Sequence, residues 1–387
     1  MIKGIFCHDL PIYKDIDGNY CSTTLTDSLF LRYFNVVDEL VVATRVYKID
    51  KTYKEAHQEK ITLPNIKFLE FPNLNTFKGI FTLIPKAKKV LKKEMQKVDL
   101  VFIRGGIIAT LGVTVARELN KPYLLENAGC AWDGYWNHSL AGKLIAPFME
   151  YRAKIDTTDA AFVIYVTEKW LQNRYPTKGI STYASNVILD TMDDIILNKR
   201  QQKNNLNKSD LIVVGTTAAI NNKAKGQQYF IEAMSKLKKY NIRYELVGSG
   251  DSNYLRSCAL KNGVADRVVF KGQMKHQQVL EWIDSLDIYI QPSMQEGLPR
   301  ALIEAMSRAC PAIGSSTGGI PELLPSDAIF KRGNVDSLIK TFKTIIESDL
   351  DAKAKVNFNK AKEYELEKLN SRRNVVYEQF KNYIINE

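Results

Sequence analysis

Short apolar runs, each about the length of a buried strand, recur along this chain and are separated by longer stretches with helical character. Continuous apolar runs suit strands that are buried on both faces of a parallel sheet. The pattern occurs twice, which predicts an α/β fold with two doubly wound, Rossmann-like domains facing each other across a cleft. The runs lie at residues 2–7, 39–44, 66–71, 100–104, 122–128 and 161–167, and then at 211–217, 244–250, 267–272, 286–293 and 310–316.

The boundary between the two halves falls in segment 197–210, LNKRQQKNNLNKSD, where Leu206 is the one apolar residue after the first leucine. Such a polar segment predicts a solvated linker and a hinge. At 387 residues the chain is also too long for one ordinary core. We therefore expect an N-terminal domain over 1–196 and a C-terminal domain over 211–369. The charged helical segment 370–387 is expected to pack back onto the first domain.

The charge balance limits the classes of partner. Lys and Arg exceed Asp and Glu by 54 − 43 = 11, which favours nucleic acid, a phosphorylated ligand or a membrane surface. Nucleic acid is not expected, because no aromatic RNA-binding signature, zinc spacing or helix-turn-helix pattern is present. A secretory signal and an apolar run of the ~18 residues that span a membrane are also missing, so we expect a cytoplasmic protein. The cysteines are scattered, without metal-ligand spacing, and are expected to be free thiols: Cys7, Cys21, Cys130, Cys258 and Cys310.

Residues 291–324, QPSMQEGLPRALIEAMSRACPAIGSSTGGIPELL, place Glu296 and Glu304 on either side of a Gly-Leu-Pro helix-start signal. A buried carboxylate is costly unless something hydrogen-bonds to it, and a ligand rich in hydroxyls would do so. A carboxylate can accept hydrogen bonds from two vicinal hydroxyls. Glu304 therefore suits a ribose, and Glu296 suits the hydroxyls of a second sugar.

The helix start between these glutamates predicts a phosphate site. Pro299 is expected as the first helical residue, because its missing N–H costs nothing there. The amides of Gly297 and Leu298 would then favour an anion. Glu304 would lie roughly 9 Å along the axis at ~1.5 Å per residue, about the span from a diphosphate to a ribose. The following STGGIPE, 316–322, is either a tight turn that begins another helix or a further contact to the same ligand.

The stretch PSMQEGLPRALIEAMSRACPAIGSSTGGIPELL resembles the donor-site signature of the large family-4 group of retaining glycosyltransferases with two Rossmann-like domains, the GT-B type. VVFKGQMKHQQVLEWIDSLDIYIQPS, YELVGSG and VGTTAAINNKAKGQQYFIEAM resemble further donor-domain segments, so the resemblance covers nearly all of 210–345. In the first half, KPYLLENAGCAWDGYWNHSLAGKLIAPFMEYRAK, FVIYVTEKWLQNRYPTKG and ASNVIL resemble capsule and cell-wall polysaccharide transferases. The resemblance implies transfer of a sugar, with retention, from a UDP- or GDP-linked donor to a saccharide or lipid-linked saccharide.

The resemblance also implies that the N-terminal domain, 1–196, binds the acceptor and that the C-terminal domain, 211–369, binds the nucleotide-sugar donor, and it implies residue roles. Glu296 and Lys225 are the expected catalytic residues. The family usually has an Arg just after the glycine of the first strand of the second domain, where this chain has Thr216. Neutralisation of the donor diphosphate would then rest on Lys225, with Lys223, Arg300 or Arg104 as further candidates. In the alternative interpretation, Lys225 belongs to an ordinary surface turn.

The segment KDIDGNY, 14–20, admits two interpretations. Asp15-x-Asp17 could hold a divalent metal, but Asp-Gly turns are commoner than metal sites, and a second such triplet starts at Asp349. We therefore expect neither a metal nor another cofactor. Gly18 is expected to let the chain approach the donor phosphates or the acceptor, where this family often has glycines.

The loop ENAGCAWDGYWNH, 126–138, is the candidate acceptor site, with Trp132, Asp133 and His138, and Arg104 is a further acceptor-side candidate. Aromatic faces beside polar groups suit stacking on a sugar. Alternatively, the tryptophans fill the core, Asp133 caps a turn and His138 starts a helix.

The sequence also bears on two other enzyme classes. A nicotinamide enzyme would show G-x-G-x-x-G after its first strand, and neither domain does. A sugar-nucleotide epimerase on the same scaffold stays open as the alternative function. The resemblance implies that the leaving diphosphate takes the acceptor's proton, so no dedicated general base is expected.

Segment 77–97, FKGIFTLIPKAKKVLKKEMQK, combines seven lysines and one glutamate with apolar residues. This composition predicts a basic amphipathic segment that lies on an anionic membrane, which would place the enzyme on the inner face of the plasma membrane with a lipid-linked acceptor. A solvated charged helix is the alternative. The apolar set comprises Phe77, Ile80, Phe81, Leu83, Ile84, Val90 and Leu91.

Overall fold

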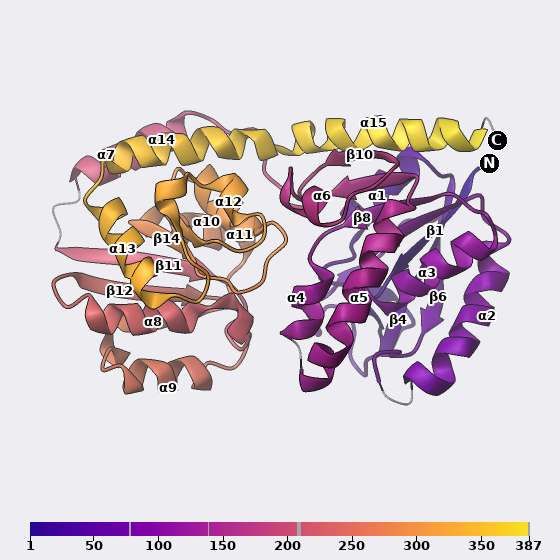
Figure 1. Ribbon diagram of the computed structural model, residues 1–387, viewed down its shortest axis with the longest axis horizontal. Coiled ribbons are helices and arrows are strands. Elements are labelled where there is room, and N and C mark those ends of the chain that lie inside the picture. Colours follow the sequence, from indigo (N-terminus) through magenta and orange to yellow (C-terminus); the bar gives the residue numbers. More distant parts are fainter. Residues whose placement is uncertain (77–78, 138, 207–209, 386–387) are drawn as a thin grey trace.

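The computed structural model describes residues 1–76, 79–137, 139–206 and 210–385. Two α/β domains lie side by side along the long axis of the molecule, each built on a largely parallel sheet flanked by helices (Figure 1). The predicted fold class is confirmed: the domains are Rossmann-like, and the last helix runs back along the first domain.

The N-terminal sheet has seven parallel strands in the order β6-β4-β1-β7-β8-β9-β10, an extended Rossmann arrangement. A small hairpin continues from the far half of β4. The predicted runs are strands; β10 was missed, because its residues, Ile-Ser-Thr-Tyr, form no continuous apolar run and none of them is buried. The strands are β1 (Lys3–His8), β2 (Ile12–Lys14), β3 (Tyr20–Ser22), β4 (Glu39–Lys48), β5 (Glu59–Lys60), β6 (Ile66–Phe71), β7 (Leu100–Arg104), β8 (Tyr123–Asn127), β9 (Phe162–Tyr165) and β10 (Ile180–Tyr183).

Helices connect these strands and cover the sheet on both faces (Figure 1). They are α1 (Asp27–Leu31), α2 (Ile84–Met95), α3 (Ile107–Glu118), α4 (Ala131–Trp136), α5 (Leu140–Thr158) and α6 (Trp170–Arg174), with 3₁₀ or π turns at Arg32–Asn35 and Gly79–Leu83.

Helix α2 corrects the membrane prediction for segment 77–97. Leu91 is buried in the domain core, and Leu83 and Ile84 pack against that core. Two of the lysines form ion pairs with Glu118 of α3. Phe77 and the side chains of Ile80 and Phe81 lie outside the described part of the structure. Because the described apolar face packs inward, apart from the half-exposed Val90, the predicted insertion of this face into a membrane is wrong.

A different helix presents apolar side chains to solvent. Leu144 of α5 is 84% exposed, and other large apolar residues lie along the same helix face. At this spacing they form a continuous stripe over three turns. The exposed stripe comprises Leu140, Leu144, Phe148 and Tyr151.

The C-terminal sheet has six parallel strands in the Rossmann order β13-β12-β11-β14-β15-β16. The strands are β11 (Leu211–Thr217), β12 (Asn241–Val247), β13 (Val268–Gly272), β14 (Ile288–Gln291), β15 (Ala312–Ser315) and β16 (Ile329–Phe330). The helices are α7 (Ile195–Leu206), α8 (Gln227–Lys236), α9 (Asn253–Lys261), α10 (His276–Ser285), α11 (Arg300–Ser307), α12 (Ile320–Leu323), α13 (Val335–Ile346) and α14 (Leu350–Ala361), with 3₁₀ turns at Lys223–Lys225, Ala265–Arg267, Ser326–Ala328 and Lys362–Tyr364.

The predicted linker is a second correction, since residues 197–206 form most of α7. Arg200 is only 3% exposed and donates to the carbonyl oxygens of Leu286 at 2.5 Å and Ile283 at 2.9 Å. Lys203 also reaches the Leu286 carbonyl. These cations satisfy carbonyls at the end of α10, so the polar run is a docked helix and not a solvated hinge. Residues 207–209 lie outside the described part.

The chain crosses between the domains just before α7 and again just before α15 (Leu366–Ile385). The crossings are joined, because the Leu366 amide donates to the Leu189 carbonyl at 2.8 Å and the Met192 amide to Glu365 at 3.0 Å. Helix α15 then lies along the N-terminal domain (Figure 1). The ring centroid of Phe380 in α15 lies 5.0 Å from that of Phe162 in β9.

Candidate active site

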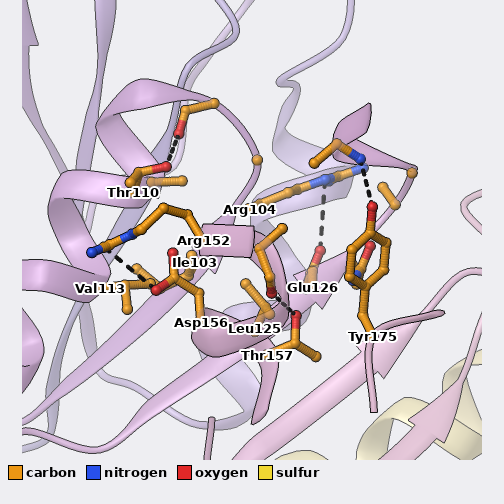
Figure 2. Close-up of a pocket in the computed structure, with 18 of the residues that line it drawn as sticks. Ile103, Arg104, Thr110, Val113, Leu125, Glu126, Arg152, Asp156, Thr157 and Tyr175 are labelled. Atoms are coloured by element: carbon orange, nitrogen blue, oxygen red, sulfur yellow. Dashed lines mark hydrogen bonds and ion pairs between the residues drawn. The ribbon is translucent and has the colours of Figure 1, made fainter. Parts of the chain in front are cut away.

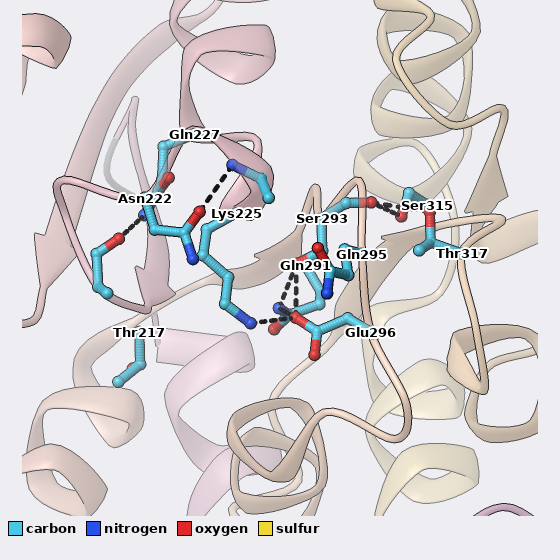
Figure 3. A network of polar contacts seen from close by, with 12 residues as sticks. Thr217, Asn222, Lys225, Gln227, Gln291, Ser293, Gln295, Glu296, Ser315 and Thr317 are labelled. Atoms are coloured by element: carbon cyan, nitrogen blue, oxygen red, sulfur yellow. Dashed lines mark hydrogen bonds and ion pairs between the residues drawn. The ribbon is translucent and has the colours of Figure 1, made fainter. Parts of the chain in front are cut away.

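The loop 292–299, which the sequence predicts to be part of a donor site, follows β14 and is held by neighbouring loops of the same domain. The Ser293 carbonyl accepts hydrogen bonds from the hydroxyls of Ser315 at 2.6 Å and Thr317 at 2.8 Å (Figure 3). On the other side, Gly226 has a φ of +74° and approaches so closely that a Cβ there would lie 2.0 Å from the Pro292 carbonyl oxygen. The loop is therefore fixed before any ligand arrives.

Glu296 and Lys225, the two predicted catalytic residues, are in direct contact. One carboxylate oxygen, Oε1, lies 2.8 Å from Lys225 Nζ and accepts from the Ser293 hydroxyl at 2.8 Å and Gln291 Nε2 at 3.2 Å (Figure 3). The Glu296 side chain is 10% exposed. Three donors on one oxygen hold the carboxylate in place, and Oε2 has no hydrogen bond from the described residues.

Glu304, in contrast to Glu296, has a side chain that no described group holds in place. It lies in the second turn of α11, and burial raises the pKa of its carboxyl, against the opposing charges of His276 and Arg300. Within the described residues, no hydrogen bond or ion pair reaches this carboxylate. A largely buried carboxylate without donors is costly in isolation and is suited to a ligand that brings hydroxyl donors.

Helix α11 begins at Arg300, one residue later than expected, and Pro299 occupies the N-cap position. Within the described residues, the amides of Gly297 and Leu298 donate to no other group. The Gly297 carbonyl accepts from the Gly319 amide at 2.7 Å, so the 316–322 turn supports the loop from behind. Two free amides beside a helix start form a suitable site for an anion.

Thr216, which stands at the family's usual Arg position, is fully buried. Its hydroxyl donates to the Ile290 carbonyl at 2.8 Å and lies 2.8 Å from the Tyr244 hydroxyl. The side chain of Thr216, in β11, therefore contacts both neighbouring strands, β12 and β14, inside the domain and does not face the anion site.

On the acceptor side, a cavity of about 460 Å³ lies at the carboxyl ends of β1, β7 and β8 (Figure 2). Arg104, a predicted acceptor residue, lines it, and Arg104 Nε is 3.7 Å from Glu126 Oε2. Side chains from α3 and α5 form the opposite walls, among them Thr110 and Arg152. The cavity therefore combines polar groups with apolar walls, which suits a sugar.

His8 lines this cavity and was missed by the sequence analysis. It is 8% exposed, and its Nδ1 lies 3.3 Å from the Gly105 carbonyl oxygen, while Nε2 has no partner among the residues that the structure describes. Burial, with help from the charge of Arg104, lowers the pKa of His8 to about 4. A neutral ring with Nδ1 protonated leaves Nε2 as a hydrogen-bond acceptor. Its place at the carboxyl end of the first strand was the available signal.

The other predicted acceptor residues lie elsewhere. Trp132 stacks on Trp136, with ring centroids 5.0 Å apart, and does not line the cavity, although Tyr135 of the same helix does. Asp133 is buried and lies 3.5 Å from Arg332 of the other domain. His138 lies outside the described residues.

Gly18 is a further correction, because it occupies the exposed turn of the β2–β3 hairpin, with a φ of +81° and nothing near its Cβ position. The glycine that allows a close approach is Gly106, where a Cβ would lie 2.1 Å from that of Asp9. Asp15 organises the same hairpin: it accepts from the Asn19 amide at 2.7 Å and the Tyr53 amide at 3.2 Å. The turn interpretation accounts for this carboxylate.

The donor loop and the acceptor cavity are neighbours. A Cβ on Gly297 would lie 2.2 Å from the carbonyl oxygen of Ala128, and Ala128 lines the cavity. Asn137 donates to Gln295 across the same gap at 3.2 Å. Glu322 of α12 completes the interface by accepting the backbone amides at the start of α6, including that of Glu168 at 2.7 Å. The two sites thus meet at one interdomain contact.

The chain is similar to known proteins in sequence and in structure. The family described as "Glycosyl transferases group 1" matches residues 197–363. Protein CapJ of Staphylococcus aureus is 32% identical over 349 residues, which cover 87% of this chain and 84% of CapJ. The amylovoran biosynthesis glycosyltransferase AmsK of Erwinia amylovora is 33% identical over 109 residues, or 26% of this chain and 27% of AmsK.

Solved structures share the fold at lower identity. Sucrose-phosphate synthase from Thermosynechococcus elongatus has a TM-score of 0.68 at 15% identity and covers 99% of this chain and 100% of its own. Anabaena HepE, in complex with UDP-glucose, has a TM-score of 0.63 at 17% identity, with 99% and 100% coverage. These likenesses extend over both domains.

Proposed function

The chain belongs to the group 1 glycosyltransferases, with the GT-B fold and a relationship to capsule and polysaccharide transferases, and we propose that it transfers a sugar, with retention, from a nucleoside diphosphate donor in surface polysaccharide biosynthesis. The observation that carries the donor assignment is Glu304, a largely buried carboxylate without donors. The two vicinal hydroxyls of a ribose would supply the hydrogen bonds it lacks. A family-4 retaining mechanism is part of this proposal.

The donor diphosphate would bind at the start of α11. The free amides of Gly297 and Leu298 and the charge of Lys225 are the groups that support this placement, whereas Arg300, another predicted donor residue, lines a separate interdomain cavity. HepE has been solved with UDP and with UDP-glucose, which makes a uridine nucleotide the first donor to test. A GDP-linked donor is the alternative.

In the proposed reaction, the bond between the anomeric carbon and the diphosphate oxygen breaks, and the acceptor hydroxyl bonds to that carbon from the same face. The electron pair leaves with the diphosphate, which also takes the acceptor's proton. Lys225 would neutralise the leaving group, while Glu296 would stabilise positive charge on the sugar ring. The contact between Lys225 and Glu296 holds both groups ready before the donor binds.

The acceptor, a saccharide or a lipid-linked saccharide, would place a sugar in the 460 Å³ cavity. His8 Nε2 would accept a hydrogen bond from one of its hydroxyls, and Arg104 would donate. The contact between Ala128 and Gly297 brings this cavity to the donor loop.

A membrane-bound acceptor is supported by the exposed stripe of α5, because Arg152 and Met149 of the same helix line the cavity. Docking of this stripe on the inner face of the plasma membrane would bring a lipid-linked sugar beside its site. No described helix is long and apolar enough to cross a membrane. All five cysteines are free thiols, which supports a cytoplasmic location.

Divalent metal is not part of the proposed mechanism, since Lys225 and the α11 amides would carry the diphosphate charge. Activity should therefore survive EDTA. Loss of activity on chelation, with recovery on adding Mg²⁺ or Mn²⁺, would contradict the metal-free mechanism.

The test of the function is release of free nucleoside diphosphate from a panel of UDP- and GDP-sugars, with and without saccharide acceptors. Release that requires an acceptor, with the donor's anomeric configuration kept in the product, supports the proposal. A sugar-nucleotide epimerase, which the family match does not favour, would convert the donor sugar without any acceptor. Inversion in the product would overturn the retaining mechanism.

A further inference from the structure

A second, larger cavity of about 660 Å³ lies between the two domains and under α15. Four arginines line it: Arg32 and Arg104 from the N-terminal domain, Arg373 from α15 and Arg300 from the start of α11. The other lining groups are mainly hydroxyls and amides, including those of Thr23, Thr24, Ser28, Asn186 and Asn370. Its walls are therefore polar and strongly cationic.

The arginine charges exceed the carboxylates beside them. Arg32 Nη2 and Arg104 Nε share one oxygen, Glu126 Oε2, at 2.8 Å and 3.7 Å. Glu59, on the exposed strand β5, is the one acidic residue among the described residues that line the cavity. Glu304 acts electrostatically on Arg300, so four cations less Glu59, Glu304 and the shared Glu126 leave an excess of one positive charge.

Arg373 is the most unusual of the four. It is 5% exposed, and within the described residues its guanidinium reaches only neutral partners, the Ser185 carbonyl and Asn370 Oδ1. Burial and the nearby charge of Arg32 lower its pKa to about 10. Glu126 acts on this cation only at longer range, and a buried cation without a carboxylate in direct contact is stabilised by a ligand that brings negative charge.

We propose that this cavity binds a phosphate or diphosphate group of the acceptor, so that the acceptor is a phosphorylated saccharide. The proposal rests on the proposed function. Four arginines around one polar cavity favour a multiply charged phosphate, and the planar guanidinium fork suits phosphate oxygens.

The position of the cavity assigns this group to the acceptor and not to the donor. Arg32 and Arg104 belong to the N-terminal domain, and Arg373 lies on the helix that packs against it. Arg104 also lines the 460 Å³ cavity, so the two cavities meet at one side chain. An acceptor could thus hold its sugar beside His8 and its phosphate beside Arg373.

The experiment titrates inorganic pyrophosphate into the full-length protein by calorimetry while saturating UDP occupies the donor site. Pyrophosphate should bind to the UDP complex, and Arg373→Gln and Arg300→Gln should each weaken that binding about ten-fold or more. Arg372→Gln is the matched control, because Arg372 is the next residue on α15 and stacks on Tyr183. The control should bind pyrophosphate like the wild type.

No binding to the UDP complex, or equal affinity in Arg373→Gln, Arg300→Gln and the control, would overturn the proposal. If Arg373→Gln does not fold, Arg32→Lys replaces it, since a lysine keeps the charge but loses the fork. Glucose 1-phosphate and glucuronate form the comparison arms, and glucuronate binding as tightly as pyrophosphate would assign the cavity to a carboxylate. These binding outcomes do not depend on turnover, so the proposed function can fail or succeed separately.

Discussion

On the proposed donor side, one oxygen of Glu296 is held by Lys225, Ser293 and Gln291, whereas on the proposed acceptor side His8 Nε2 lines a cavity and has no partner in the described part of the chain. The donor loop is stabilised by its own domain before ligand binds. The acceptor cavities leave buried polar groups, His8 Nε2 and the Arg373 charge, for a ligand to satisfy. Glu304 is likewise left for a ligand on the donor side, so the contrast is between the Glu296–Lys225 pair, which protein contacts hold, and the surrounding groups, which we propose that ligands satisfy.

The largest expected effect is on kcat, and it follows from a change at Glu296. Glu296→Gln keeps the size of the side chain but removes the charge that balances Lys225 and would stabilise the reacting sugar. We expect kcat to fall about 10²–10³-fold, with little change in UDP affinity. Steady-state turnover and UDP titration on the same variant separate these quantities.

The Glu296–Lys225 contact adds a control. If the two residues act as a unit, Glu296→Gln combined with Lys225→Met should lower kcat little more than the worse single variant. Wild-type kcat in Glu296→Gln would remove that residue from the mechanism.

Glu304→Ala separates the proposed role of Glu304 from that of Glu296. No described protein group donates to the Glu304 carboxylate, so the substitution breaks no hydrogen bond within the described protein. Removing a charged hydrogen-bonding partner of the ribose should cost about 1.5–3 kcal/mol, or about 10- to 150-fold in UDP affinity, with kcat largely kept. Titration of UDP and GDP measures it. Unchanged affinity for both nucleotides would contradict the ribose assignment.

The relative positions of the predicted donor residues follow from sequence, because these residues are close together in the chain. Glu296, Gly297 and Glu304 lie on one loop and helix, and strand–loop–helix order fixes where they point. The acceptor side draws on residues as far apart as His8, Arg104 and Arg373, which no local pattern connects.

The errors have the same physical origin. The lysines of α2 and the polar run of α7 were interpreted by composition, but composition does not say which neighbour a helix face meets. Leu91 packs into the core and Arg200 caps α10 because tertiary contacts decide both positions. The exposed stripe of α5 went unnoticed for the same reason.

Acid should destabilise the acceptor side through His8, a group that the donor loop lacks. The folded-state pKa, about 4, lies below the ordinary value of 6.5, so the stabilising contribution of neutral His8 is complete above pH 6.5 and is lost as pH falls toward 4. Between pH 7 and pH 5 the free energy of unfolding should drop by about 2 kcal/mol from this group.

Urea denaturation at both pH values tests this effect. His8→Gln should remove that part of the pH dependence, and His57→Asn, at an exposed position with a φ of +52°, is the matched control. An unchanged pH dependence in His8→Gln would show that His8 is not held neutral by the fold.

The smallest expected effect concerns membrane binding. Replacing Phe148 by Ser should weaken sedimentation with anionic liposomes about ten-fold, since burying a large apolar side chain is worth about 1.5–3 kcal/mol. Val90→Ser on α2 is the control and should leave sedimentation unchanged. Equal loss in both variants, or no binding by the wild type, would remove the α5 stripe as a docking surface.

The most direct test of a donor domain and an acceptor domain with separate roles is one kinetic comparison of His8→Gln and Glu304→Ala. With a working donor and acceptor, both substrates are varied and the initial rate of UDP release is measured. We expect Glu304→Ala to raise the KM for the donor alone and His8→Gln to raise the KM for the acceptor alone. A rise in donor KM in His8→Gln, with acceptor KM unchanged, would contradict this expectation.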